Sequence, residues 1–245
     1  MPNIAGWPVA IGQEAWSSNA AANKAHPLGQ PGVTADGRFY RYCLAGATSL
    51  VVGNALQTRV EDVDHDNIAV RATAIGDKAL LITTGASGGA LDADEYADGF
   101  AVIDTTPGLG YLYKISGHAA IAASTDGSLN LADNETVQVA LTTSSKITLV
   151  ANPYSKVIQH PVTTATGAPV GGCTYIITNA QYGWIQSGGP GAALIAGTPG
   201  AGQPVTTTGA VAGALTVHSA ELSSVAHMMV TGRDGKVLPV QWLLY

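Results

Sequence analysis

Residues 111–117 read YLYKISG, and residues 182–188 return to the same pattern as YGWIQSG. A small-residue segment follows each copy, AAI at residues 119–121 and AAL at residues 192–194. An aromatic, strand-like phrase that returns with a similar sequel is typical of a chain assembled from similar β units. No candidate catalytic side chain accompanies either copy, so the pattern indicates a protein built to present surfaces.

Strand-like segments continue on both sides of this phrase and indicate the fold class. Short apolar, β-branched and aromatic runs are bounded by Gly, Asp, Asn or Pro, and few segments after residue 36 have helical periodicity. We therefore predict an all-β (mostly β) protein made of β-barrel or β-sandwich modules, and the sequence does not choose between these two. The predicted strands cover residues 38–44, 50–52, 68–72, 79–84, 101–103, 112–115, 137–141, 147–150, 175–178, 184–187, 192–195, 214–217, 226–230 and 237–244.

Three parts of the chain differ in pattern. Residues 1–35 contain four prolines and two tryptophans, Trp7 and Trp16, without a sustained period, and predict an extended N-terminal arm. Because indole rings are costly to leave in water, we expect the arm to lie against a surface, either of its own domain or of a neighbour. Residues 36–155 predict a β domain, and residues 156–245 predict a second β module that packs on the first or continues it.

Charge is scarce in this chain. Charged residues make up 11% of the sequence, Gly occurs 30 times, and the formal net charge is −6. A surface with so few charged side chains is unusual for a free monomer. It suits faces that neighbouring subunits cover, since burying few charges limits the desolvation cost. Neutralising phosphates needs clustered Lys and Arg, so we predict no nucleic-acid partner.

No membrane or export signal is evident in the sequence. The N-terminus lacks a basic segment followed by a continuous apolar run, and no apolar run approaches the length of a membrane span. We therefore expect no membrane partner and synthesis in the cytoplasm of the producing cell.

The two cysteines, Cys43 and Cys173, lie far apart in the sequence, and neither belongs to a C-x-x-C pair. A free buried thiol in each of two strands is the favoured interpretation. A disulfide between them stays open.

Two acidic segments are candidates for a cation site. Residues 61–66 read EDVDHD, and oxygen-rich loops of this kind can hold Ca²⁺, but the glycine that lets such a loop turn sharply is missing. Residues 92–99 read DADEYADG, in which Tyr96 stands where a calcium loop needs its third ligand. We interpret both as solvated loops and predict no metal or cofactor, while ion binding by either loop stays open.

Catalytic motifs are incomplete. The six histidines are never at metal-ligand spacing. Ser87 lies in GASGG at residues 85–89 but lacks the strand-turn-helix context of a nucleophile elbow, and SGGPG at residues 187–191 lacks the Gly-Lys-Ser/Thr of a phosphate loop. With no usable acid, base, nucleophile or ligand set, we predict that the protein is not an enzyme.

Several stretches carry a family resemblance. The N-terminal part contains LGQP at residues 28–31 and DGRFYRY at 36–42, and the C-terminal part contains YGWIQ at 182–186, GTPG at 197–200 and GQPV at 202–205. Together they resemble the Gly/Ala/Thr-rich head proteins of tailed bacteriophages that decorate the capsid shell beside the major capsid protein. The chain departs from this family in being longer than a minimal decoration protein and in repeating the aromatic phrase.

The resemblance implies a β-rich cement protein of the virion, often homotrimeric in such families, bound to the outer capsid surface at junctions between capsomers. Its partners would be the major capsid protein and other copies of this chain, and no catalytic residue is carried over. Large aromatic side chains often anchor interfaces, so we predict that Trp7 and Trp16 are interface anchors.

Two other classes of function remain as alternatives. A receptor- or glycan-binding module of a phage tail fibre or spike would display aromatics in a groove, with Tyr182 and Trp184 as candidates. A cell-envelope hydrolase would need converging carboxylates, for instance from residues 61–66 and 92–98. The sequence favours the structural shell protein over both.

Overall fold

The computed structural model describes residues 8–13, 21–162, 165–207, 211–218 and 223–244. Within these residues the secondary structure is almost entirely β, with no α-helix and a short 3-10 turn, η2 (Val63–His65). The prediction of an all-β protein is confirmed.

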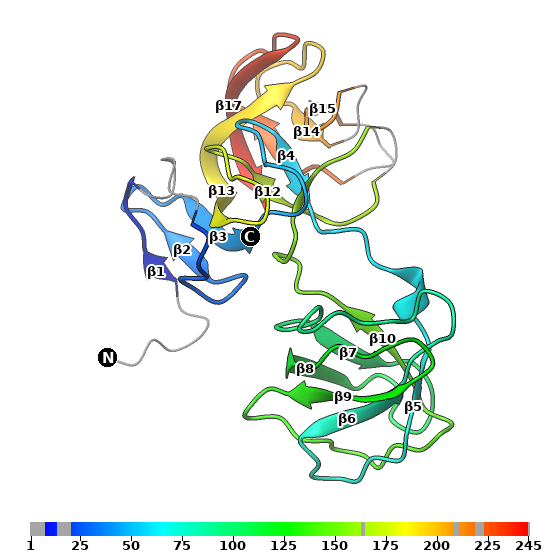
Figure 1. Ribbon diagram of the computed structural model, residues 1–245. Coiled ribbons are helices and arrows are strands. Elements are labelled where there is room, and N and C mark those ends of the chain that lie inside the picture. Colours follow the sequence, from blue (N-terminus) through cyan, green and yellow to red (C-terminus); the bar gives the residue numbers. More distant parts are fainter. Residues whose placement is uncertain (1–7, 14–20, 163–164, 208–210, 219–222, 245) are drawn as a thin grey trace. The chain divides into compact units, whose positions relative to one another are not determined.

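The chain folds as two compact units, and the residues of one are inserted within the sequence of the other (Figure 1). Residues 61–152 form the barrel unit, and residues 1–60 with 153–245 form the sheet unit. The insertion lies between β4 (Ala55–Gln57) and β11 (Ile158–Gln159), which are antiparallel partners in the sheet unit. The chain therefore leaves one strand pair of the sheet, builds the barrel, and returns to the same strand pair.

This division differs from the expected one into residues 36–155 and 156–245. The segment 36–60 packs with the C-terminal part of the chain, because β3 (Phe39–Leu44) pairs with β13 (Tyr182–Ile195). Strand β4 likewise pairs with β12 (Pro169–Gly172). Pairing between segments so far apart leaves no local signal in the sequence.

Eleven strands form one sheet in the sheet unit. The main path runs β1-β2-β3-β13-β17-β16-β14-β15, while β12 pairs with β13 and β4, and β4 pairs with β11. The strand pairs are antiparallel except β1 with β2, which is parallel. The other strands are β1 (Val9–Ala10), β2 (Pro31–Val33), β14 (Pro204–Thr206), β15 (Thr216–Val217), β16 (Ala226–Met228) and β17 (Lys236–Leu243).

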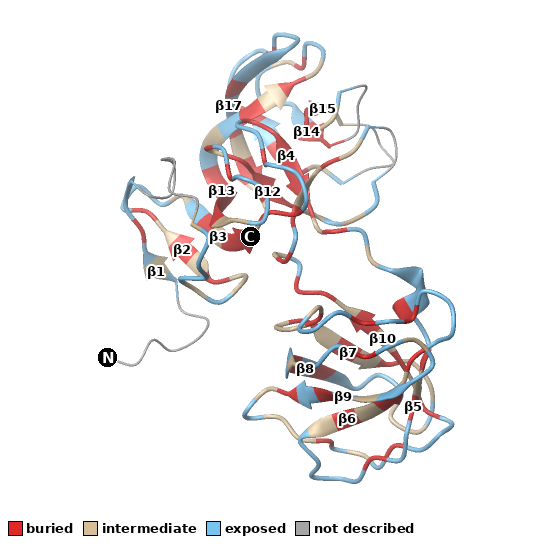
Figure 2. Ribbon diagram, viewed as in Figure 1, coloured by how far each residue is buried: buried red, intermediate tan, exposed pale blue. Residues whose placement is uncertain are grey.

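Strand β13 is the centre of this sheet. It pairs with β3 over its first part and with β17 over its second, and every residue from 183 to 189 is buried (Figure 2). Its side chains enter three separate core clusters, through Trp184, Ile185 and Ile195. The pairing with β3 shifts register after Gln186, whose amide nitrogen donates to the carbonyl oxygens of Gly188 (3.1 Å) and Pro190 (2.8 Å). This side chain therefore satisfies carbonyl groups around a bulge, where the ladder is locally disrupted.

Trp242 on β17 is the largest fully buried side chain of the sheet unit. Two glycines on neighbouring strands make room for its ring: a Cβ atom on Gly172 would lie 2.3 Å from Cζ2, and one on Gly191 would lie 2.8 Å from Cδ1. The indole therefore fits a space that only glycine leaves open at these positions.

The barrel unit is a closed six-stranded barrel with strand order β10-β5-β6-β9-β8-β7, every neighbouring pair being antiparallel. Buried and partly exposed residues alternate along β6 (Figure 2). Leu80 and Ile82 are the buried ones, as expected for side chains that face the barrel interior. The barrel interior is filled by aliphatic side chains and the rings of Tyr96 and Tyr113. Its strands are β5 (Ile68–Val70), β6 (Ala79–Thr83), β7 (Phe100–Ile103), β8 (Leu112–Gly117), β9 (Asp126–Leu131) and β10 (Lys146–Val150).

The two copies of the aromatic phrase form strands, but in unlike settings. The first copy lies in β8, which has one inward face in the barrel, and the second opens β13, which is buried without alternation. The segments that follow also differ, since residues 192–194 continue β13 whereas Ile121 makes only an isolated bridge to Leu91. The phrase therefore reflects a local preference for strand and does not mark two equivalent modules.

The described part of the N-terminal segment is not a free arm. Residues 9–10 and 31–33 are strands of the sheet unit, and Ala21 forms a two-bond bridge with Tyr182, with N···O distances of 3.0 and 2.8 Å. Of the two surfaces considered from sequence, the one contacted by the described residues is that of their own domain.

Candidate interaction surfaces

Tyr182 and Trp184, two of the four predicted partner-binding residues, lie together in an aromatic cluster that we define as His26, Tyr42, Tyr182 and Trp184. The Tyr42 and Tyr182 rings stack with centroids 5.9 Å apart, and the Trp184 ring lies edge-on to Tyr42 at 5.2 Å. His26 contacts both Tyr42 and Trp184, at 5.1 and 5.2 Å. The structure therefore joins these two residues through Tyr42, which was not among the predicted site residues.

The N-terminal segment covers Trp184, which is only 5% exposed. Gly32 on β2 lies directly against the indole, since a Cβ atom there would be 2.8 Å from Cζ3, and Ile11 belongs to the same buried cluster. The indole thus holds the chain's own strands β1 and β2 onto β13 and leaves little surface for an outside partner. Trp7 and Trp16 lie outside the described residues.

Cys43 and Cys173 are free thiols in one core cluster of the sheet unit. Burial raises the pKa of Cys173 to about 12 and that of Cys43 further still. The Cys173 thiol donates to the carbonyl oxygen of Tyr175 at 2.7 Å. Because the thiolate is the reactive form, two thiols that stay protonated at neutral pH are inert packing groups here.

Carboxylates of both acidic segments bind backbone amides. In residues 61–66, Asp62 caps η2 by accepting from the Asp64 N–H at 3.0 Å, and Glu61 accepts from the Ala151 N–H at 3.4 Å. In residues 92–98, Asp94 accepts from the His118 N–H at 3.0 Å. Within the described ranges, no group of three or more His, Cys, Asp or Glu side chains could hold a metal ion.

Two histidines far apart in sequence meet at Tyr96 inside the barrel unit. His65 Nδ1 lies 2.6 Å from the Tyr96 hydroxyl, and His118 Nε2 accepts from the Tyr96 backbone N–H at 3.2 Å. The remaining ring nitrogens lie near carbonyl oxygens, His65 Nε2 with Ala90 and His118 Nδ1 with Ala119. His118 therefore accepts through Nε2 and donates through Nδ1, and both ring nitrogens of His65 also have hydrogen-bond partners. Sequence spacing gave no sign of this arrangement, because closure of the barrel brings the residues together.

We expect His160 to make the stability of the sheet unit depend on pH. Its side chain is buried, Nδ1 donates to the Pro161 carbonyl oxygen at 2.9 Å, and burial lowers its pKa. Below about pH 6.5, the usual histidine pKa, the unfolded chain takes up a proton that the folded chain resists, so stability falls as the pH falls.

We expect His160→Asn, whose amide can still donate to Pro161, to reduce this pH dependence. The measurement is the melting temperature of the sheet unit at pH 7.5 and 5.5 in both proteins. A drop of equal size in wild type and variant would contradict the assignment.

An exposed apolar patch of the sheet unit consists of Val51, Val52, Ile176 and Val237. Two links bring the segments that carry these side chains together: Leu50 and Ile177 form an antiparallel bridge, and Gly53 lies against Val237, with 2.8 Å between its ideal Cβ position and Cγ2. Contiguous exposed apolar groups often mark an interaction site.

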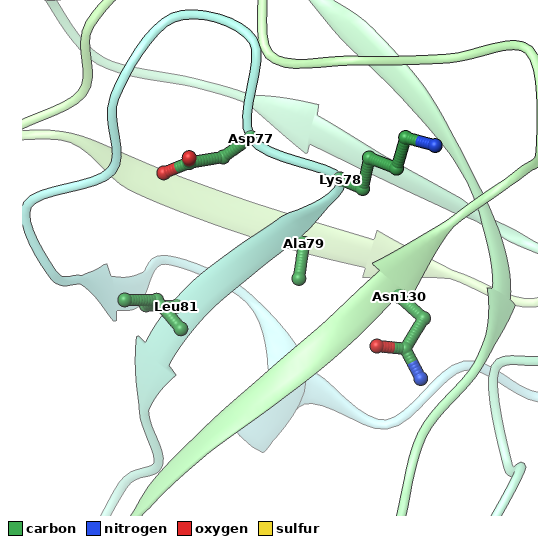
Figure 3. Close-up of a pocket in the computed structure, with 5 residues that line it drawn as sticks. All are labelled: Asp77, Lys78, Ala79, Leu81 and Asn130. Carbon is green, nitrogen blue, oxygen red and sulfur yellow. The ribbon is translucent and has the colours of Figure 1, made fainter.

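Two of the open pockets of the barrel unit lie over β6 and β9 and beside Tyr111. One, of about 290 Å³, lies over β6 and β9, where Ala79 and Leu81 form an apolar floor beside Asn130 (Figure 3). Asp77 and Lys78 also line it, and the Asp77 carboxylate accepts a hydrogen bond from the Ala74 N–H at 2.8 Å. The second pocket, of about 170 Å³, lies beside the exposed ring of Tyr111.

Comparisons with known proteins give no relative for this chain. No family model matches it, and neither a curated protein nor a solved structure is significantly similar. In the described residues, no helix has the length and apolar character needed to cross a bilayer.

Proposed function

We propose that this chain is a virion structural protein that binds the outer surface of a phage capsid, beside the major capsid protein, and stabilises contacts between capsomers. The observation that carries the proposal is the exposed apolar patch on a sheet unit whose sequence is poor in charge. Burying Val51, Val52, Ile176 and Val237 against a neighbour would remove apolar surface from water without desolvating ionised groups. The family resemblance of the N- and C-terminal stretches supports the same role.

Homotrimer formation and the capsomer junction as binding place belong to this proposal. The eleven-stranded sheet, with its centre in β13, is the element of the sheet unit that would carry these contacts. No catalytic residue is required for the role.

The glycan-binding alternative relied on Tyr182 and Trp184 as an exposed platform. Trp184 is buried under strands β1 and β2, so its ring face is not open for stacking. At this site of the sheet unit the structural role is therefore better supported than glycan binding.

Shell binding is tested by cosedimentation with capsid shells that lack this protein. We expect Ile176→Glu to reduce binding at least tenfold, about 1.4 kcal/mol, because a carboxylate would be buried without a partner. Val217→Glu, a similarly exposed position on β15, is the matched control and should bind normally. Mass analysis in solution checks the trimer. Equal binding by both variants would contradict the assignment of the patch.

A further inference from the structure

The pocket beside Tyr111 is framed by the loop that enters β8 and by the segment that follows β9. It has a volume of about 170 Å³ and combines two exposed apolar side chains with four polar ones. Its lining includes Tyr111, Leu112, Asn134, Glu135, Thr136 and Gln138.

Hydrogen bonds fix the walls of this pocket. The buried Tyr113 accepts from the Gln138 backbone N–H through its hydroxyl at 3.0 Å. Glu135 accepts from the Lys114 N–H at 2.7 Å, and Lys114 in turn accepts from the Ala132 N–H at 2.9 Å. The segment 132–138 is therefore held along β8 before any ligand arrives, which lowers the cost of binding.

Tyr111 supplies an aromatic platform. Its ring stacks on that of Tyr113, with centroids 6.1 Å apart and planes 13° from parallel, yet Tyr111 remains 42% exposed. A ring supported from within the protein and open to solvent is oriented to receive a flat apolar surface of a ligand.

The polar groups beside this platform are mostly uncharged. The Gln138 amide nitrogen donates to Thr136, at 2.8 Å to the carbonyl oxygen and 3.0 Å to the hydroxyl, which fixes the orientation of the amide. The amides of Asn134 and Gln138 and the Thr136 hydroxyl offer donors and acceptors together, as neutral hydroxyl groups require. Glu135 adds a carboxylate, and no Lys or Arg lines the pocket, so anionic ligands are disfavoured.

We propose that this pocket binds a neutral pyranose unit of a glycan. A pyranose with equatorial hydroxyls has flat C–H faces that can lie on Tyr111, and hydroxyls at its edge that can reach Glu135, Asn134 and Gln138. A peptide bound by strand addition would need a free strand edge, but β8 is paired with both β7 and β9 in the closed barrel. The proposal concerns the barrel unit and does not depend on shell binding.

The test is titration of the ¹⁵N-labelled full chain with methyl β-D-glucopyranoside, followed by amide chemical shifts. We expect saturable shifts at residues 111–113 and 134–138, with a dissociation constant on the order of 1–10 mM. Tyr111→Ala should weaken binding at least tenfold, whereas Tyr111→Phe and the matched control Ile75→Ala should bind as the wild type does. Ile75 is also exposed on the barrel unit and does not line this pocket. The absence of saturable shifts, or equal affinity in Tyr111→Ala, would overturn the proposal.

A second titration tests the preference for a neutral sugar. Methyl β-D-glucopyranosiduronate, which carries a carboxylate, should bind more weakly than the neutral glycoside, and Glu135→Gln should reduce the difference. Equal or tighter binding of the acidic sugar to the wild type would refute the neutral class.

Discussion

Trp242→Ala is expected to lower the free energy of unfolding of the sheet unit by about 3–5 kcal/mol, the range for removing a buried Trp or Phe. The ring is fully buried, and Gly172 and Gly191 lie against it. Because glycine has no side chain, these two residues cannot fill the cavity that the substitution would leave. With typical domains stable by about 5–15 kcal/mol, much of the margin would be lost. The free energy of unfolding is measured by chemical denaturation, followed by far-ultraviolet circular dichroism and not by tryptophan fluorescence.

Two further variants make the Trp242 prediction specific to packing. Trp242→Phe keeps most of the apolar contact, and the indole N–H has no hydrogen-bond partner among the described residues, so we expect a much smaller loss. Val237→Ala on the same strand removes an exposed side chain and should change stability by less than about 0.5 kcal/mol. A loss under about 1 kcal/mol for Trp242→Ala would show that the site collapses freely around the missing ring.

Removing residues 61–152 and joining Val60 to Pro153 through a short Gly-Ser linker is expected to leave the sheet unit folded. The reason is that β4 and β11 pair with each other on either side of the insertion, with Gln57 opposite Ile158 and Leu56 opposite Gln159. The linker would then close an ordinary antiparallel connection, and loop length alone has a weak effect on stability.

The excised barrel, residues 61–152, should fold alone and unfold cooperatively. Its two ends are tied to the barrel itself, because Glu61 accepts from the Ala151 N–H and the Asn152 side-chain amide donates to the Asp98 carbonyl oxygen at 3.2 Å. Calorimetry of both pieces and of the full chain is the measurement. If either piece lacked a cooperative transition, the two units would depend on each other for stability.

Strands could be predicted from the sequence where several apolar residues lie close together. The expected strands at residues 79–84, 147–150 and 237–244 correspond closely to β6, β10 and β17. Strand β9 was missed because its sequence, DGSLNL, places only Leu129 and Leu131 in the core and fills the other positions with Gly and polar residues.

Other expected strands are absent because an apolar run does not guarantee a partner. Residues 50–52 contribute only the isolated bridge of Leu50 to Ile177, and residues 137–141 contribute only that of Leu141 to Thr73. Conversely, the segments expected separately at 184–187 and 192–195 are one strand, β13, since the glycines between them adopt the ladder instead of a turn.

The candidate sites were less predictable than the fold. Trp184 was a candidate for an exposed aromatic in a binding groove, but its exposure depends on where strands β1 and β2 lie, which local sequence does not reveal. The pocket at Tyr111 was not anticipated, because Gln138 reaches Tyr113 only through the turn after β9. The repeated phrase contains Tyr111, but the fold, and not the phrase, determines which of its two copies lies at a surface.

The main path of the sheet ends at β1 and β15, each only two residues long. Such short borders present few unpaired backbone groups, so a second molecule has little on which to continue hydrogen bonding. At high concentration this protein should consequently resist fibril formation, and ordered association is expected to depend on the fit of side chains between molecules.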